Sequence, residues 1–141
     1  MSKYKFVGFQ EHIEIPEGFE RLKLDIEFSS PLNSKDAFGL ISDPENISQW
    51  LFTVKSFESK QGGKVVFQSA DATFDAVCTS FVLGKEVSFV SDEFGNLKVR
   101  VIKNSKASTF IAECAILTDR AEEKTALIEA AFLRLQELAQ Q

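Results

Sequence analysis

The sequence predicts an α+β fold: one antiparallel sheet of seven strands, two short helices between strands 1 and 2, and a long C-terminal helix. Three observations lead to this prediction. Seven stretches have the alternating or short apolar pattern of strands. The breaks between the last six are too short for crossover helices, so neighbouring strands should be antiparallel. The final stretch instead repeats its apolar residues at helical spacing.

The first strand is expected at residues 21–28, "RLKLDIEF", where apolar and charged residues alternate. Residues 1–20 also contain strand-like stretches, which Pro16 and Gly18 interrupt. We therefore expect an N-terminal extension, either flexible, a flap or an added edge strand. Residues 21–141 contain no linker or repeat, so they are predicted to form a single domain.

Two short helices should follow, at residues 34–41 and 44–50. Between them, Asp43 suits an N-cap and Pro44 suits the first helical position, where its missing N–H costs nothing. The spacing of apolar residues in the second helix places Trp50, the only tryptophan, on the face that meets the core.

Six more strands are expected in close succession, separated by the turn-forming breaks "KQGGK", "SAD", "LGK", "EFGN" and "NSK". They are placed at residues 52–58, 64–69, 73–82, 85–91, 96–103 and 107–117. The last contains "STFIAECAIL", which is apolar on both faces and indicates a central strand covered on both sides. The C-terminal helix is predicted at residues 119–139, with Asp119 and Glu122 as a capping box.

Composition narrows the function classes. The net charge of −5 and the scattered Lys and Arg residues do not favour a nucleic-acid partner. No stretch approaches the ~20 apolar residues of a membrane span, and the N-terminus lacks the apolar region of a signal peptide. A cytoplasmic protein is therefore expected. The 14 Phe residues predict a wide apolar interior, either packed solid or enclosing a cavity.

Few residues are suited to catalysis or metal binding. Cys78 and Cys114 lie in strand-like runs without metal or redox spacing, so buried reduced thiols are expected. Asp75, Glu113 and the lone His12 are the acid–base candidates. A carboxylate buried inward would have a raised pKa and could act as a general base; the alternative is that both face solvent or form ion pairs. We predict no catalytic residue, metal or cofactor.

The order of elements resembles the helix-grip fold, also called START-like, SRPBCC or birch-pollen-allergen fold. In that fold a curved sheet wraps around the last helix. The stretch "SSPLNSKDAFGLISDPENISQWL" resembles the signature of the branch named after the activator of heat-shock-protein-90 ATPase, and "GGK" at residues 62–64 resembles its Gly-Gly hairpin. The later strands resemble those of a compact bacterial START-like group. The residues that match the signature are Ser30, Pro31, Phe38, Leu40, Asp43, Pro44, Glu45 and Trp50.

The resemblance implies a cavity between sheet and C-terminal helix that holds a lipid, sterol-like or polyketide-like molecule. Non-catalytic binding of such a hydrophobic small molecule is therefore predicted. Alternatives are a chaperone-ATPase activator-like interaction module, with a chaperone as partner, and a cyclase- or dehydratase-type enzyme using the same cavity. A monomer or weak dimer is expected. The predicted cavity residues are Trp50, Phe67, Phe74, Phe89, Phe110, Phe132 and Leu135.

Overall fold

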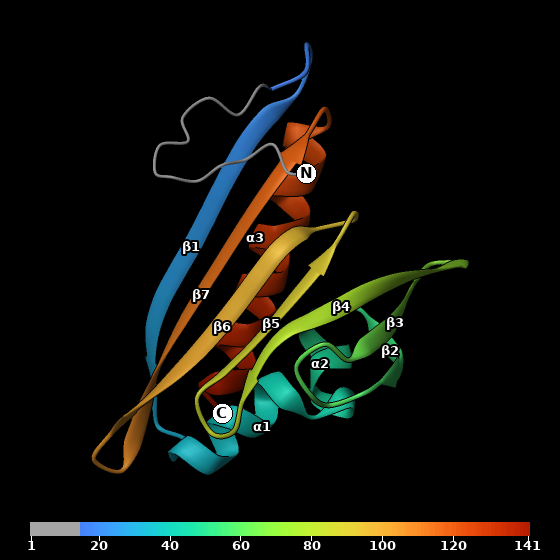
Figure 1. The fold of residues 1–141 in the computed structure, drawn as a ribbon. Coiled ribbons are helices and arrows are strands. Elements are labelled where there is room, and N and C mark those ends of the chain that lie inside the picture. Colours follow the sequence, from blue (N-terminus) through green and yellow to red (C-terminus); the bar gives the residue numbers. More distant parts are fainter. Residues whose placement is uncertain (1–14) are drawn as a thin grey trace, which may run out of the picture.

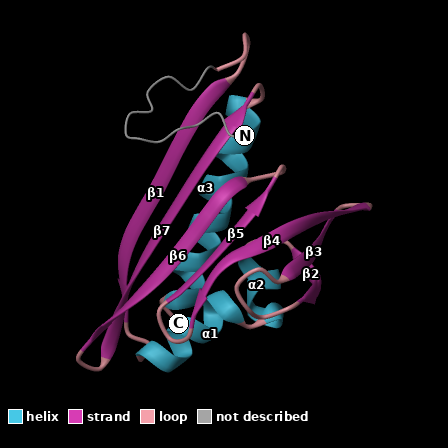
Figure 2. Cartoon of the chain, viewed as in Figure 1, coloured by secondary structure: helices cyan, strands magenta, loops and turns pink. Residues whose placement is uncertain are grey.

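The computed structural model describes residues 15–141 and shows a seven-stranded antiparallel sheet with a long helix, α3, along one face (Figure 1). Figure 2 distinguishes the strands from the helices. The predicted fold class is thus confirmed. In chain order the elements are β1 (Glu20–Ser30), α1 (Ser34–Ser42), α2 (Pro44–Trp50), β2 (Thr53–Phe57), β3 (Lys64–Ser69), β4 (Ala72–Val82), β5 (Glu86–Ser91), β6 (Gly95–Asn104), β7 (Ala107–Thr118) and α3 (Ala121–Ala139).

The N-terminal extension predicted at residues 1–20 lies mostly outside the described residues. Within the described part, Pro16 and Gly18 form a turn, in which the Phe19 N–H donates to the Pro16 carbonyl at 3.0 Å. The division into an extension and a single domain at residues 21–141 stays a prediction.

The sheet has the strand order β1-β7-β6-β5-β4-β3-β2. From β2 to β7 each strand pairs with the next one in the chain. Only the pairing of β1 with β7 is long-range, and its register places Leu24 opposite Cys114. This pairing brings the first strand to the end of the sheet, beside the last strand (Figure 1).

The two short helices are fixed by side-chain hydrogen bonds. Asn33 caps α1 by accepting from the Asp36 N–H at 2.8 Å. Asp43 caps α2 as predicted, accepting from the Glu45 N–H at 2.9 Å. Trp50 Nε1 then donates to the Leu40 carbonyl at 2.9 Å, so its indole ring is buried with its polar atom satisfied.

The capping box predicted for the last helix is wrong. The helix α3 begins at Ala121, its N-cap is Arg120, and no side chain caps it. The reason is that β7 continues to Thr118, whose hydroxyl accepts from the Arg120 N–H at 2.9 Å. Asp119 therefore lies in the link between strand and helix.

The prediction that β7 is covered on both faces is also wrong. Phe110, Ala112 and Cys114 are buried on its inner face, which α3 covers. On the outer face Glu113 and Leu117 are exposed to solvent. Apolar residues on the outer face of a strand are common on protein surfaces, and they mimic the pattern of a strand buried on both sides.

Candidate functional site

The interior between the sheet and α3 is the site that the sequence predicts. The structure places the predicted residues in or beside this core, and Phe132 and Leu135 enter it from α3. Phe74 is half-buried at the margin. The buried members of the predicted set are Trp50, Phe67, Phe89, Phe110, Phe132 and Leu135.

Five phenylalanine rings pack together in the part of the core beside β3, β4 and β5. Phe67 lies at the centre, with the ring centroids of Phe52, Phe74, Phe89 and Phe94 between 5.5 and 5.9 Å from its own. The ring planes are tilted or perpendicular, the geometry that aromatic pairs prefer. This phenyl cluster joins three predicted residues with two, Phe52 and Phe94, that sequence reasoning missed.

Phe94 reaches the interior because of the turn that carries it. The Ser91 hydroxyl accepts from the Glu93 and Phe94 N–H groups, at 3.1 and 3.2 Å. Gly95 has φ of +79°, and a Cβ there would overlap the Ala115 carbonyl. Lys124 Nζ, buried on α3, donates to the Glu93 carbonyl at 2.7 Å. An apolar residue within the otherwise polar break "DEFGN" was the signal available in the sequence.

A narrow cavity lies between the sheet and α3. The cavity there, which we call the interior seam, has a volume of about 10 Å³, enough for the centre of one water molecule at most. Arg134 borders the seam and donates from Nη2 to the Trp50 carbonyl at 3.0 Å. Phe132 is the one predicted residue along it. The seam is lined by Leu51, Phe52, Phe94, Leu97, Cys114, Leu127, Ile128, Ala131, Phe132 and Arg134.

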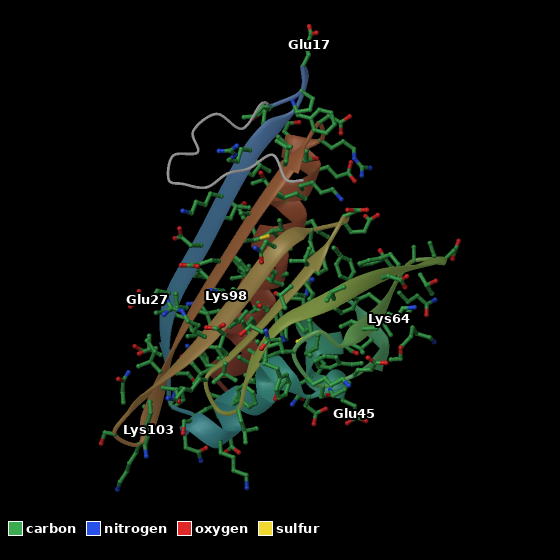
Figure 3. The ribbon with its side chains drawn as sticks, in the orientation of Figure 1. Glu17, Glu27, Glu45, Lys64, Lys98 and Lys103 are labelled. Carbon is green, nitrogen blue, oxygen red and sulfur yellow. The ribbon has the colours of Figure 1, made fainter. Side chains whose placement is uncertain are left out.

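A larger depression lies on the surface where the β4–β5 turn stands beside the end of β6. This hairpin groove has a volume of about 540 Å³ and combines apolar and basic side chains. Leu83, at the turn, is 81% exposed. Figure 3 shows Lys103 at the end of β6 and Lys98 further back on the same strand. The groove is lined by Ser34, Val82, Leu83, Gly84, Lys85, Glu86, Arg100, Val101, Ile102 and Lys103.

The acid–base candidates do not meet in the interior. Asp75 and Glu113 are exposed on the outer face of the sheet, so they lack the burial that would make either a general base. His12 lies outside the described residues. Within residues 15–141, no group of three or more His, Cys, Asp or Glu side chains could hold a metal ion.

The two cysteines are buried thiols. Burial raises the pKa of the Cys114 thiol to about 12, and burial also raises the pKa of Cys78. Cys114 Sγ donates to the Phe94 carbonyl at 3.0 Å, which ties β7 to the β5–β6 turn. Both thiols are therefore held in the protonated, unreactive form.

Comparison with solved structures identifies the fold as helix-grip. CalU16 from Micromonospora echinospora matches with a TM-score of 0.59 at 12% identity, over 83% of this chain and 85% of that one. The Aha1 dimer from Colwellia psychrerythraea matches with a TM-score of 0.62 at 9% identity, over 84% of this chain and 93% of that one. A conserved Enterococcus faecalis protein of unknown function matches with a TM-score of 0.69 at 10% identity, over 89% of this chain and 74% of that one.

At these identities the likeness extends to the fold alone. No protein family model matches the chain, and no curated protein matches its sequence. Among the helices of residues 15–141, none is long and apolar enough to cross a membrane.

Proposed function

We propose that this protein binds, without catalysis, a hydrophobic small molecule with an anionic end, such as a fatty acid, in the hairpin groove. The observation that supports the proposal is the composition of the groove. Val82, Leu83 and Ile102 are exposed apolar residues on its wall. Its volume of about 540 Å³ lies within the range of about 300–1,000 Å³ typical of small-molecule sites.

The charges of the groove favour an anion. Lys85, Arg100 and Lys103 line it, against the single acid Glu86, although the whole chain has a net charge of −5. A guanidinium group presents paired N–H donors that match the two oxygens of a carboxylate. An acyl chain lying on Leu83 and Ile102 would place its carboxylate within this basic lining. The groove is open to water, so affinity in the micromolar range is expected.

Binding in the interior is the competing form of the same function. At the interior seam, which holds no more than about one water molecule, it would require lining side chains such as Phe52 and Phe94 to move apart. Trp50 distinguishes the two locations. Its ring is 1% exposed and its carbonyl accepts from Arg134 at the seam, so opening the interior would change its emission. Occupation of the groove would leave that emission unchanged.

The test is calorimetric titration with dodecanoate and with dodecanol, followed in parallel by Trp50 fluorescence. We expect saturable binding of dodecanoate, much weaker binding of dodecanol, and constant emission. Arg100→Gln should weaken dodecanoate binding about tenfold, because a charged hydrogen bond is lost. Lys98→Gln is the matched control, since Lys98 is also half-buried on β6 but lies outside the groove.

Three results would overturn the groove proposal: no binding, binding that Arg100→Gln does not weaken, or a saturable change of Trp50 emission. The last would place the ligand in the interior. The chaperone-activator and cyclase or dehydratase functions stay predictions, as does the cytoplasmic location.

A further inference from the structure

Among the described residues 15–141, the strand β1 forms one end of the sheet and has an unpaired edge. Its eleven residues pair with β7 on one side, and no strand among residues 15–141 pairs with it on the other (Figure 1). Such an edge leaves a row of backbone N–H and C=O groups available to another strand. Edge strands in native proteins are normally short, bulged or blocked. The strand β1, in contrast, has 11 residues and pairs with β7 without any shift of register.

The charges on the outer face of β1 are arranged symmetrically about Leu24. On the outer face, Arg21 and Lys23 precede Leu24, and Asp25 and Glu27 follow it. None of these four side chains takes part in an ion pair within the described part of the chain. If β1 meets a second copy of itself in antiparallel fashion, each cation therefore faces an anion.

We propose that two copies of this protein associate through β1, with the two-fold axis passing beside Leu24. Arg21 then lies opposite the partner's Glu27, and Lys23 lies opposite the partner's Asp25. Because each pair occurs twice in a symmetric dimer, four cross-strand ion pairs form. A two-fold interface uses the same surface on both subunits, so the assembly closes at two copies and yields one continuous sheet.

The charges exclude the neighbouring registers. Pairing must shift by two residues to keep the inner faces on the same side of the sheet. Centring the axis on Lys23 would place this lysine opposite its own copy, and centring it on Asp25 would do the same to two carboxylates. Moving further, to Leu22 or Ile26, would oppose Arg21 with Lys23 or Asp25 with Glu27. Like charges directly opposite each other are destabilising, so of these five registers only the one centred on Leu24 is free of repulsion.

The inner face of β1 also favours a partner strand. Leu22, Leu24 and Ile26 are only half-buried, because no described strand lies beyond them. In the proposed register Leu24 packs on its own copy and Leu22 packs on the partner's Ile26. An open groove of about 410 Å³ between β1 and the first half of α3 leaves room on that face. The dimer therefore buries apolar surface as well as pairing charges.

The first test is sedimentation equilibrium of the full chain over a micromolar to millimolar concentration range. We expect a reversible monomer–dimer equilibrium. Lys23→Glu and Asp25→Lys should each weaken dimerisation about tenfold, since each places like charges opposite one another twice. The double variant Lys23→Glu/Asp25→Lys restores opposite charges and should restore dimerisation. Matching melting curves of the four proteins would show that the fold is retained.

The second test is disulfide trapping under air oxidation. In Leu24→Cys the two introduced thiols lie directly opposite, within the distance that a disulfide spans. Leu22→Cys is the matched control, because it is equally half-buried but would stand about 13 Å from its copy. A covalent dimer of the first variant alone supports the register. A strictly monomeric chain, failure of the double variant to restore dimerisation, or equal trapping of both variants would overturn the proposal; a monomer would indicate that another segment of the chain occupies the edge.

Discussion

Cys114 illustrates how strongly a single buried position is constrained. The residue is 2% exposed, its Sγ donates to the Phe94 carbonyl, and it borders the interior seam. A thiolate there would lose its hydration without gaining a cation, so burial holds the thiol pKa near 12. This difference from an unfolded thiol links its ionisation to the stability of the whole chain.

We predict that stability falls above about pH 9 partly because of Cys114. An unfolded thiol ionises near pH 9.0 and the folded one near pH 12, so between these values only the unfolded state releases the proton. The contribution is complete below pH 9 and is lost as the pH rises toward 12. Urea unfolding of the wild type and of Cys114→Ala between pH 8 and about pH 10.5 tests this. Parallel pH profiles of the two proteins would contradict it.

Individual residues were also the least predictable from sequence. The position of Phe67 in the core follows from strand alternation, whereas the burial of Phe94 depends on a turn held by Ser91 and Lys124. Asp119 is a residue type that often caps helices, but α3 begins two residues later because β7 continues to Thr118. Such outcomes depend on tertiary contacts that local patterns do not contain.

At the scale of elements, the junction between α1 and α2 concentrates several roles in one residue. Asp43 ends α1, with its N–H donating to the Gly39 carbonyl, and its carboxylate caps α2. The α2 helix has only seven residues, too few to be stable without its cap and its packing. It nevertheless positions Trp50 and the start of the phenyl cluster.

Asp43→Ala should lower the free energy of unfolding by about 1 kcal/mol, because the N–H of Glu45 loses its acceptor. Asp43→Asn retains a side-chain oxygen in the same place and should cost much less. Urea unfolding of both variants, followed by far-UV circular dichroism, measures the difference. Equal midpoints for the two substitutions would show that the cap contributes nothing.

Strands were predictable to within one or two residues because their pattern and their turns agree. The register of a hairpin such as β5–β6 follows from a short break with Gly95 at positive φ. The environment of an element was predicted wrongly where the same apolar pattern fits both a buried and a solvent-exposed face. The outer face of β7 is apolar enough to read as buried, yet it faces water.

For the whole molecule, the described structure predicts one cooperative unit. Trp50 links α2 to α1 through the Leu40 carbonyl and to α3 through Arg134, while far-UV circular dichroism reports on all helices and strands together. Thermal unfolding monitored by Trp50 emission and by circular dichroism should therefore give the same midpoint. An earlier transition of the fluorescence would mean that the helical end unfolds on its own, against a single domain at residues 21–141.

The volume of the interior was the property of the whole molecule that composition left open. Fourteen Phe residues are compatible with a solid core or with a cavity, because volume depends on how rings interlock rather than on how many there are. The centroid distances around Phe67 show closely packed rings in that part of the core, and the interior seam beside α3 has a volume of about 10 Å³.

The pairing of β1 with β7 also has a consequence during synthesis. Leu24 pairs with Cys114, which the ribosome adds 90 residues later (114 − 24). At about 5–20 residues per second, the strand β1 therefore remains without its partner strand for roughly 5 to 18 s. Meanwhile the hairpins from β2 to β6 can form from neighbouring segments, which close rapidly. Among the described strands, β1 is therefore made first and joins the sheet last, and its row of Leu22, Leu24, Ile26 and Phe28 stays open to other nascent chains until β7 has been made.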